Sequence, residues 1–63
     1  MRVNGELRSG GPLSVRALLD ELHLDGRGVA VARNGEIVPR SSWESENVGG
    51  EDVIEIVTAA AGG

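Results

Sequence analysis

Hydrophobic and polar residues alternate with a helical period in one part of the chain, residues 14–22. The apolar side chains there are spaced i, i+3, i+4 and i+7, which places them on one stripe of a helix with 3.6 residues per turn. They are Val15, Leu18, Leu19 and Leu22. Ser14 is of the type that caps a helix N-terminus, and the glycine-containing segment 25–28 favours a helix end. The pattern predicts one amphipathic helix.

Two Asn-Gly pairs predict β-hairpins, because this pair is favoured in two-residue type I′ turns. Asn4-Gly5 lies within residues 1–8, and Asn34-Gly35 joins two β-rich runs within residues 29–38. Pro39 ends the second hairpin, since proline has no N–H to donate to a strand ladder. The chain is therefore predicted to form a hairpin on each side of the helix.

The last predicted element is a strand at residues 52–58. It carries β-branched residues on both faces, which argues against a position at the edge of a sheet. Before this strand, the capping-box spacing of Ser41 and Glu44 predicts a single helical turn over residues 42–45. The segment 47–50 between that turn and the strand is predicted to be a loop.

The order of these elements predicts a ubiquitin-like β-grasp fold of the α+β class. If the last strand pairs in parallel beside the first, it lies in the centre of a mixed sheet and the helix crosses one face. We expect a β-grasp domain over residues 1–58 and a flexible tail over residues 59–63. Five extended residues reach at most about 17 Å, which is enough to enter the active site of a partner. The carboxylate of Gly63 would then react only after activation, most simply by attack on the α-phosphate of ATP.

Composition excludes several classes of function. A chain of 63 residues holds one domain, and without Cys and with only one His, His23, it offers no thiol nucleophile and no metal site. The net charge of −4 argues against nucleic acid, and no apolar stretch approaches the ~20 residues of a membrane span. The sequence offers no pair of nucleophile and base that would indicate an enzyme. We expect a cytoplasmic protein with no bound cofactor.

One segment of the chain, VAVARNGEIVPRSSW at residues 29–43, resembles the ThiS-type sulfur carriers of thiamine biosynthesis. The shared features are an Asn-initiated turn, an Ile-Val-Pro-Arg step and a Trp three residues after the Arg. In this chain they are Asn34, Ile37, Val38, Pro39, Arg40 and Trp43. The C-terminal string DVIEIVTAAAGG resembles the end of the same family. Two departures are that Glu51, rather than a glycine, precedes Asp52, and that Ala61 precedes the two glycines.

The resemblance implies a specific role for the tail. A ThiF-like adenylyltransferase would use ATP to adenylate Gly63, and a cysteine desulfurase would supply the sulfur that makes a thiocarboxylate. A ThiG-like thiazole synthase would then receive that sulfur. Gly62 and Ala61 would thread the active site of the partner. A molybdopterin-type sulfur carrier and a ubiquitin-like protein modifier are the alternatives.

Two residues of the resembling segment are candidates for a partner interface, Arg40 and Trp43. For Trp43 a place in the core is favoured over a contact with a partner. Arg40 would recognise an acidic partner or pair within the chain with Glu36 or Glu44. The acidic residues of segment 44–52 are predicted to form a solvated face.

Overall fold

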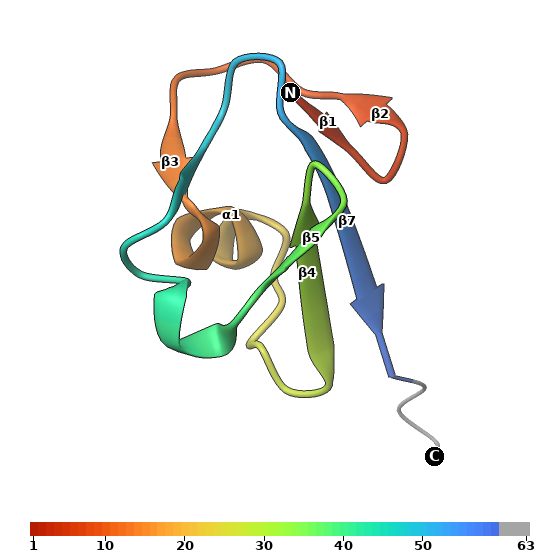
Figure 1. Ribbon diagram of the computed structural model, residues 1–63, viewed down its shortest axis with the longest axis vertical. Coiled ribbons are helices and arrows are strands. Elements are labelled where there is room, and N and C mark those ends of the chain that lie inside the picture. The colour runs from red at the N-terminus through yellow and green to blue at the C-terminus, as the bar shows by residue number, and fades with distance from the viewer. Residues whose placement is uncertain (60–63) are drawn as a thin grey trace.

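The computed structural model describes residues 1–59, and the fold is built on a five-stranded mixed sheet with the strand order β2-β1-β7-β4-β5 (Figure 1). The strands are β1 (Arg2–Val3), β2 (Glu6–Leu7), β4 (Val29–Arg33), β5 (Glu36–Val38) and β7 (Val53–Thr58). The strand β7 runs parallel to β1, with Val3 opposite Ile54, and antiparallel to β4, with Val31 opposite Ile56. The predicted β-grasp arrangement, with the last strand central beside the first, is confirmed.

The two faces of β7 differ. Ile54 and Ile56 are buried against the helix, whereas Val53 and Val57 are exposed on the other face of the sheet. The prediction of a central strand is therefore correct, although only one face of it is covered. Hydrogen bonds to neighbours on both edges, and not burial of both faces, define its central position.

Both Asn-Gly pairs form the predicted turns. Asn4 and Asn34 have φ values of 52° and 53°, and Gly5 and Gly35 both have φ of 87°. Positive φ at both central positions is what a type I′ turn requires, and it matches the twist of the strands that the turn joins. The turns give the hairpins β1–β2 and β4–β5.

The helix α1 (Val15–Glu21) begins at Ser14, whose side chain accepts a hydrogen bond from the Ala17 N–H at 3.0 Å. This confirms the predicted cap. The helix ends at Leu22, and His23 follows in a left-handed conformation with φ of 62°. In residues 1–59 no helix has the length and apolar character needed to cross a membrane.

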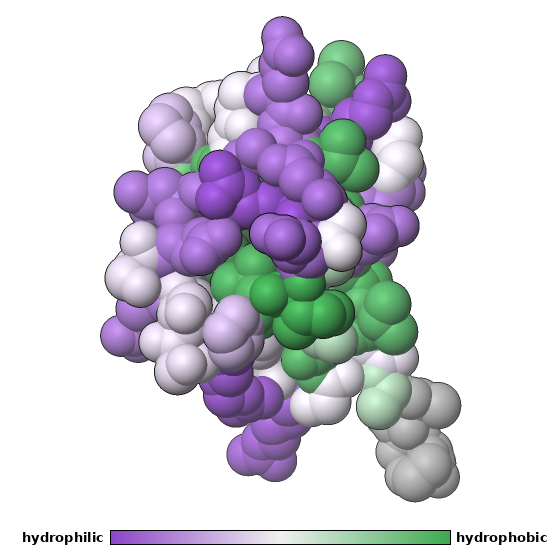
Figure 2. Space-filling model, viewed as in Figure 1, coloured by the Kyte–Doolittle hydropathy of each residue, from purple (hydrophilic) through white to green (hydrophobic). Residues whose placement is uncertain are grey.

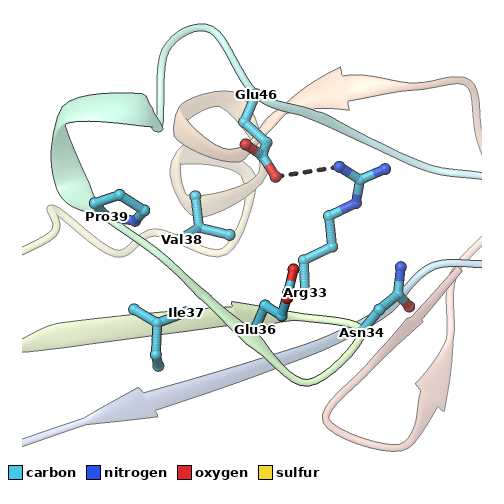
Figure 3. A pocket seen from close by; sticks show the side chains of 7 residues that line it. All are labelled: Arg33, Asn34, Glu36, Ile37, Val38, Pro39 and Glu46. Atoms are coloured by element: carbon cyan, nitrogen blue, oxygen red, sulfur yellow. Dashed lines mark hydrogen bonds and ion pairs between the residues drawn. The ribbon is translucent and has the colours of Figure 1, made fainter.

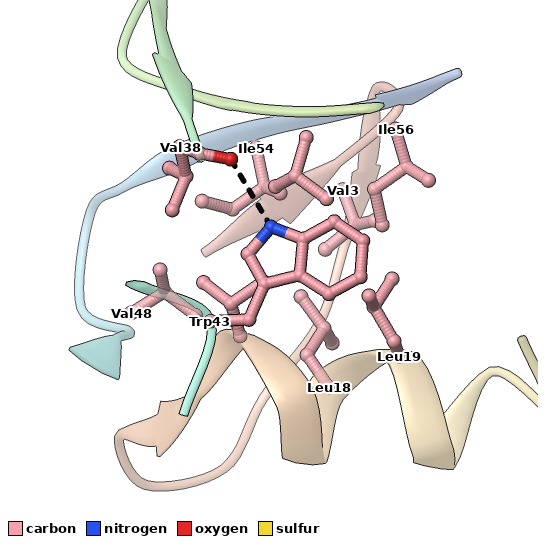
Figure 4. Packing of buried hydrophobic residues seen from close by; sticks show 10 residues of the cluster. Val3, Leu18, Leu19, Val38, Trp43, Val48, Ile54 and Ile56 are labelled. Atoms are coloured by element: carbon pink, nitrogen blue, oxygen red, sulfur yellow. Dashed lines mark hydrogen bonds between the residues drawn. The ribbon is translucent and has the colours of Figure 1, made fainter. Parts of the chain in front are cut away.

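The core lies between α1 and the sheet, and the Trp43 ring lies in it between the side chains of the helix and those of the strands (Figure 4). Its buried members are all apolar, as expected of a small domain that has no disulfide to stabilise it. They are Val3, Val15, Leu18, Leu19, Val31, Val38, Trp43, Val48, Ile54 and Ile56.

Two predictions for the segment between β5 and β7 are wrong. The helical turn starts earlier than predicted, with the 3-10 helix η1 (Arg40–Ser42), which begins after Pro39 and has no side-chain cap, so Ser41 does not start it. The predicted turn over residues 42–45 itself is present, because the Ser45 and Glu46 N–H groups bond to the Ser42 carbonyl. Pro39 takes the N-cap position because its own carbonyl accepts the Ser42 N–H at 2.8 Å. The predicted loop at 47–50 contains a short strand, β6 (Asn47–Val48), which pairs antiparallel with β3 (Leu13–Ser14).

Candidate functional site

Trp43 is part of the core, with 3% of its surface exposed. Its indole Nε1–H donates a hydrogen bond to the Val38 carbonyl at 3.1 Å, so the one polar atom of the ring is satisfied inside the domain (Figure 4). The favoured interpretation, a place in the core, is confirmed. Trp43 offers a partner little surface of its own, but it supports residues that lie on its ring.

Arg40 is one of these residues. Its guanidinium carbon lies 5.1 Å from the centroid of the Trp43 ring, and its Nη2 donates to the Gly26 carbonyl. Within residues 1–59 no ion pair joins Arg40 to a carboxylate, so the predicted pairing with Glu36 or Glu44 is wrong. A backbone carbonyl and an aromatic ring hold this cation instead.

The Asn34 turn is tied to the start of β7. The Asn34 side chain donates to Asp52 Oδ1 at 3.0 Å and accepts the Val53 N–H at 2.9 Å. Asp52 Oδ2 accepts bonds from the Gly49 N–H and from Arg33 Nε. The bond from Asn34, followed by those from Gly49 and the charge of Arg33, holds the pKa of Asp52 below its ordinary value.

Arg33 bridges two of the acidic residues of segment 44–52. It lies 3.1 Å from Glu46 Oε2 and 3.2 Å from Asp52 Oδ2, and the hydrogen bond to Glu46 with the charge of Asp52 raises the pKa of Arg33. The predicted solvated face is therefore correct for Glu44 and Glu51, which are exposed. It is wrong for Glu46 and Asp52, which are half-buried and paired with Arg33. Across residues 1–59 no group of three or more potential ligands is placed to hold a metal ion.

A hollow of about 270 Å³ lies beside this bridge, at the turn between β4 and β5 (Figure 3). It is lined by Arg33, Asn34, Glu36, Ile37, Val38, Pro39 and Glu46. In the close-up the Arg33 side chain points across the hollow to Glu46. The one cation that lines the hollow, Arg33, already pairs with Glu46 and Asp52, so the hollow is better explained by structural pairing than by substrate binding.

The open face of the sheet carries exposed apolar side chains. Strand registers place Leu7, Ile37, Val53 and Val57 on the face that does not meet α1. They are among the large hydrophobic residues that are most exposed, up to 75% for Leu7. In Figure 2 apolar atoms gather over β5 and the end of β7, and a few more lie among the hydrophilic residues of the upper part. Exposed apolar surface of this kind is typical of proteins that dock with others.

The chain leaves the domain at the end of β7, where the Ala59 N–H donates to the Gly28 carbonyl at 2.8 Å. Ala59, which was predicted to belong to the tail, is thus still bonded to the domain. The predicted reactive residue Gly63, and Gly62 and Ala61 before it, lie outside the described residues.

Two residues that hold β7 and the Trp43 ring in place were not predicted from the sequence. The Asn4 side chain accepts the Ile56 N–H at 2.8 Å and donates to the Ile56 carbonyl at 3.1 Å. Arg16 lies on the same tryptophan ring as Arg40, 5.7 Å from its centroid. The only signal for the role of Asn4 was that both turns contain Asn, whose side chain has a donor and an acceptor. Nothing in the helix pattern indicated the second.

These features define a class of protein. The domain is a β-grasp fold whose central strand, held on both edges, leads into the segment that carries Gly62 and Gly63. This is the architecture of the ubiquitin-like carriers and modifiers.

The chain belongs to the ThiS family, whose model matches residues 1–63. The resemblance to ThiS-type sulfur carriers, noted on residues 34–43 and on the C-terminal string, is confirmed. The fold is similar to a crystal structure of the thiamine biosynthesis protein ThiS from Geobacter metallireducens, with a TM-score of 0.79 and 29% identity over 98% of this chain and 96% of that one. A solution structure of a thiamine biosynthesis protein from the same organism gives a TM-score of 0.78 and 29% identity, over 98% of this chain and 85% of that one.

Two further proteins are similar in sequence. A thiazole synthase of Paramagnetospirillum magneticum is 48% identical over 62 residues, which cover 97% of this chain. The chain spans only 19% of the length of that protein. An uncharacterized protein, ycf40, of Porphyra purpurea is 30% identical over 64 residues, covering all of this chain and 90% of the relative.

Proposed function

We propose that this protein is a cytoplasmic sulfur carrier of thiamine biosynthesis and that the carboxylate of Gly63 carries the sulfur. The observation that carries the proposal is the match of the ThiS family to the whole chain, which includes Gly62 and Gly63. The protein itself is a co-substrate and not an enzyme. Its partners perform the chemistry.

The reaction proceeds in three steps. On a ThiF-like adenylyltransferase, a Gly63 carboxylate oxygen attacks the α-phosphorus of ATP, and pyrophosphate leaves. The terminal sulfur of a persulfide, which a cysteine desulfurase forms from cysteine, then attacks the acyl carbon, and AMP leaves. A thiol such as cysteine cleaves the S–S bond of the resulting acyl disulfide and is itself oxidised to a disulfide, so that the thiocarboxylate is released and one oxygen has been replaced by one sulfur. The thiocarboxylate finally donates its sulfur to the substrate of a thiazole synthase.

The fold supports this role by anchoring the tail. The strand β7 is paired on both edges, and the Gly28 carbonyl holds Ala59 at the point where the chain leaves the sheet. Four further residues reach at most about 14 Å when extended. A carboxylate at that distance enters a partner's active site while the domain stays outside, and glycines pass a slot too narrow for larger residues.

The thiazole synthase partner has support from a relative. The thiazole synthase of Paramagnetospirillum magneticum contains a segment 48% identical to this chain, which accounts for 19% of its length. A segment of this kind joined to a thiazole synthase is the arrangement expected if the two act together.

The test is the intact mass of the protein after incubation with a ThiF-like enzyme, ATP, cysteine and a cysteine desulfurase. We expect a gain equal to the exchange of one oxygen for one sulfur, located at Gly63 by fragmentation. Deletion of Gly63 abolishes the gain, whereas Gly11→Ala leaves it intact, because a Cβ at Gly11 meets no atom within 4 Å. An unchanged mass with a competent enzyme contradicts the proposal. Amide-linked products on other proteins indicate the modifier instead.

A further inference from the structure

Two cations lie on one tryptophan. The guanidinium carbons of Arg16 and Arg40 lie 5.7 Å and 5.1 Å from the centroid of the Trp43 ring. Arginines favour aromatic faces because the ring quadrupole attracts the cation and the planar groups stack. One buried residue therefore positions two positive charges that come from different elements, α1 and η1.

Backbone carbonyls hold both cations. Arg40 donates to the Gly26 carbonyl, and Arg16 donates to the Leu24 carbonyl at 2.9 Å and to Asp20 at 3.1 Å. A carbonyl accepts a hydrogen bond without cancelling the charge. Within residues 1–59 four of the six arginines make ion pairs with carboxylates; Arg16, which pairs with the exposed Asp20, is one of them, and Arg40 is not. The charge of Arg40 is therefore held in place by a carbonyl, and no carboxylate of residues 1–59 neutralises it.

Both guanidinium groups converge on Gly26. A Cβ placed on this glycine would lie 3.0 Å from Trp43 Cζ3, 3.1 Å from Arg16 Nη1 and 3.8 Å from Arg40 Nη2. Gly26 is buried and has a φ of 96°. The absence of a side chain at this position thus leaves the room in which the two cations approach each other.

The pair lies at the end of the domain from which the tail leaves. Gly28, whose carbonyl accepts the Ala59 N–H, is two residues beyond Gly26, a distance of at most about 7 Å along the chain. Figure 1 shows the loop between α1 and β4 at the same end as the end of β7. An enzyme that takes the tail into its active site must approach this end.

We propose that Arg16 and Arg40 form a docking pair that binds carboxylate side chains beside the tail entrance of the enzyme that activates Gly63. The inference rests on the proposed function and adds the chemistry of the contact. Guanidinium groups bind carboxylates through two parallel hydrogen bonds, and preordering by Trp43 and the carbonyls reduces the rotamer entropy lost on binding. In a chain of net charge −4, such a fixed pair also selects the orientation of approach.

The test compares adenylation kinetics of the full chain with the ThiF-like enzyme. We expect Arg16→Gln/Arg40→Gln to raise the KM for the carrier about tenfold or more, with kcat unchanged and a weaker dependence of KM on salt. The matched control is Arg2→Gln, which removes an exposed cation that makes no ion pair within residues 1–59 and lies at the start of the sheet. A rise in KM no larger than that of the control overturns the docking pair.

Folding is checked by the thermal midpoint and by Trp43 fluorescence. If the double variant is unfolded, Arg40→Gln alone carries the test, and Arg40→Lys, which keeps the charge but not the planar fork, is expected to restore part of the affinity. If the unaltered protein is not adenylated by the enzyme, both the proposed function and the docking pair are ruled out. If the unaltered protein is adenylated and the variants show the same KM as it does, only the docking pair is ruled out.

Discussion

The Asn4 side chain completes the edge of β7 beyond the end of β1. The strand β1 has two residues, and its last pairing partner on β7 is Ile54. The next residue of β7 that faces this edge is Ile56, and Asn4 binds both its N–H and its C=O, at 2.8 Å and 3.1 Å. The amide of one side chain thus replaces a third residue of the strand.

Replacement of Asn4 by glycine removes both bonds while the turn remains, because glycine accepts the φ of 52°. Each hydrogen bond contributes about 1 kcal/mol net, and the extra freedom of glycine in the unfolded chain adds about 0.4–1 kcal/mol. We expect a loss of about 2–3 kcal/mol. A domain of 63 residues is stabilised by about 3–9 kcal/mol in total, so the loss is a large part of it.

Urea unfolding followed by fluorescence measures this loss directly, since Trp43 is the only aromatic residue and is buried. Asn4→Asp is the companion variant. Its carboxylate still accepts the Ile56 N–H but cannot donate to the carbonyl, so its stability should lie between those of the other two proteins. Amide exchange at Ile56 should accelerate most in Asn4→Gly, which loses the acceptor of this N–H. An Asn4→Gly protein within about 0.5 kcal/mol of the unaltered one would refute the role of the side chain, because that is the usual effect of a neutral surface change.

Two further predictions concern the turn at Asp52 and the glycine under Trp43. The pKa of Asp52 is lowered from 3.8 by bonds to the ionised form, so its stabilising contribution is complete above about pH 4 and is lost as the pH falls through the lowered value. Asp52→Asn should therefore be less stable at neutral pH and should lose less stability on acidification, as measured by urea midpoints across that range. Gly26→Ala should destabilise the domain by about 1–3 kcal/mol, since the Cβ would meet Trp43 at a positive φ. Gly11→Ala, with open space and no such φ, should leave the urea midpoint unchanged.

The local signals in the sequence predicted the elements with their own periodicity or turn chemistry. The stripe of α1, the Ser14 cap and the two Asn-Gly turns each depend on residues close together in the chain. The pairing of β3 with β6 depends on two segments more than thirty residues apart, each of only two residues. No alternation is visible at that length. Gly49 allows the approach, since a Cβ there would lie 2.9 Å from Pro12 Cα, but a glycine in a loop looks the same whatever it faces.

The sequence predicted only part of the candidate site, again because the contacts that join distant segments leave no local pattern. Family resemblance identified Arg40 and Trp43, and the capping-box spacing misplaced the turn that holds them because Ser41 and Glu44 match a pattern that many exposed segments match. The partner of Arg40 is a backbone carbonyl, that of Gly26, fourteen residues away. Carbonyls are present at every residue, so no sequence pattern distinguishes the one that is used. The nearby carboxylates of Glu36 and Glu44 were the visible alternatives.

The structure also gives a physical reason for the extent of the family motif. At one end of residues 34–43, Asn34 holds the first N–H of β7, at Val53. At the other end, Arg40 and Trp43 hold the loop that contains Gly26, and two residues later Gly28 receives the chain as it leaves β7 at Ala59. One segment therefore secures both ends of the central strand. Changes within it should therefore loosen β7 at both of its ends, at Val53 and at Ala59.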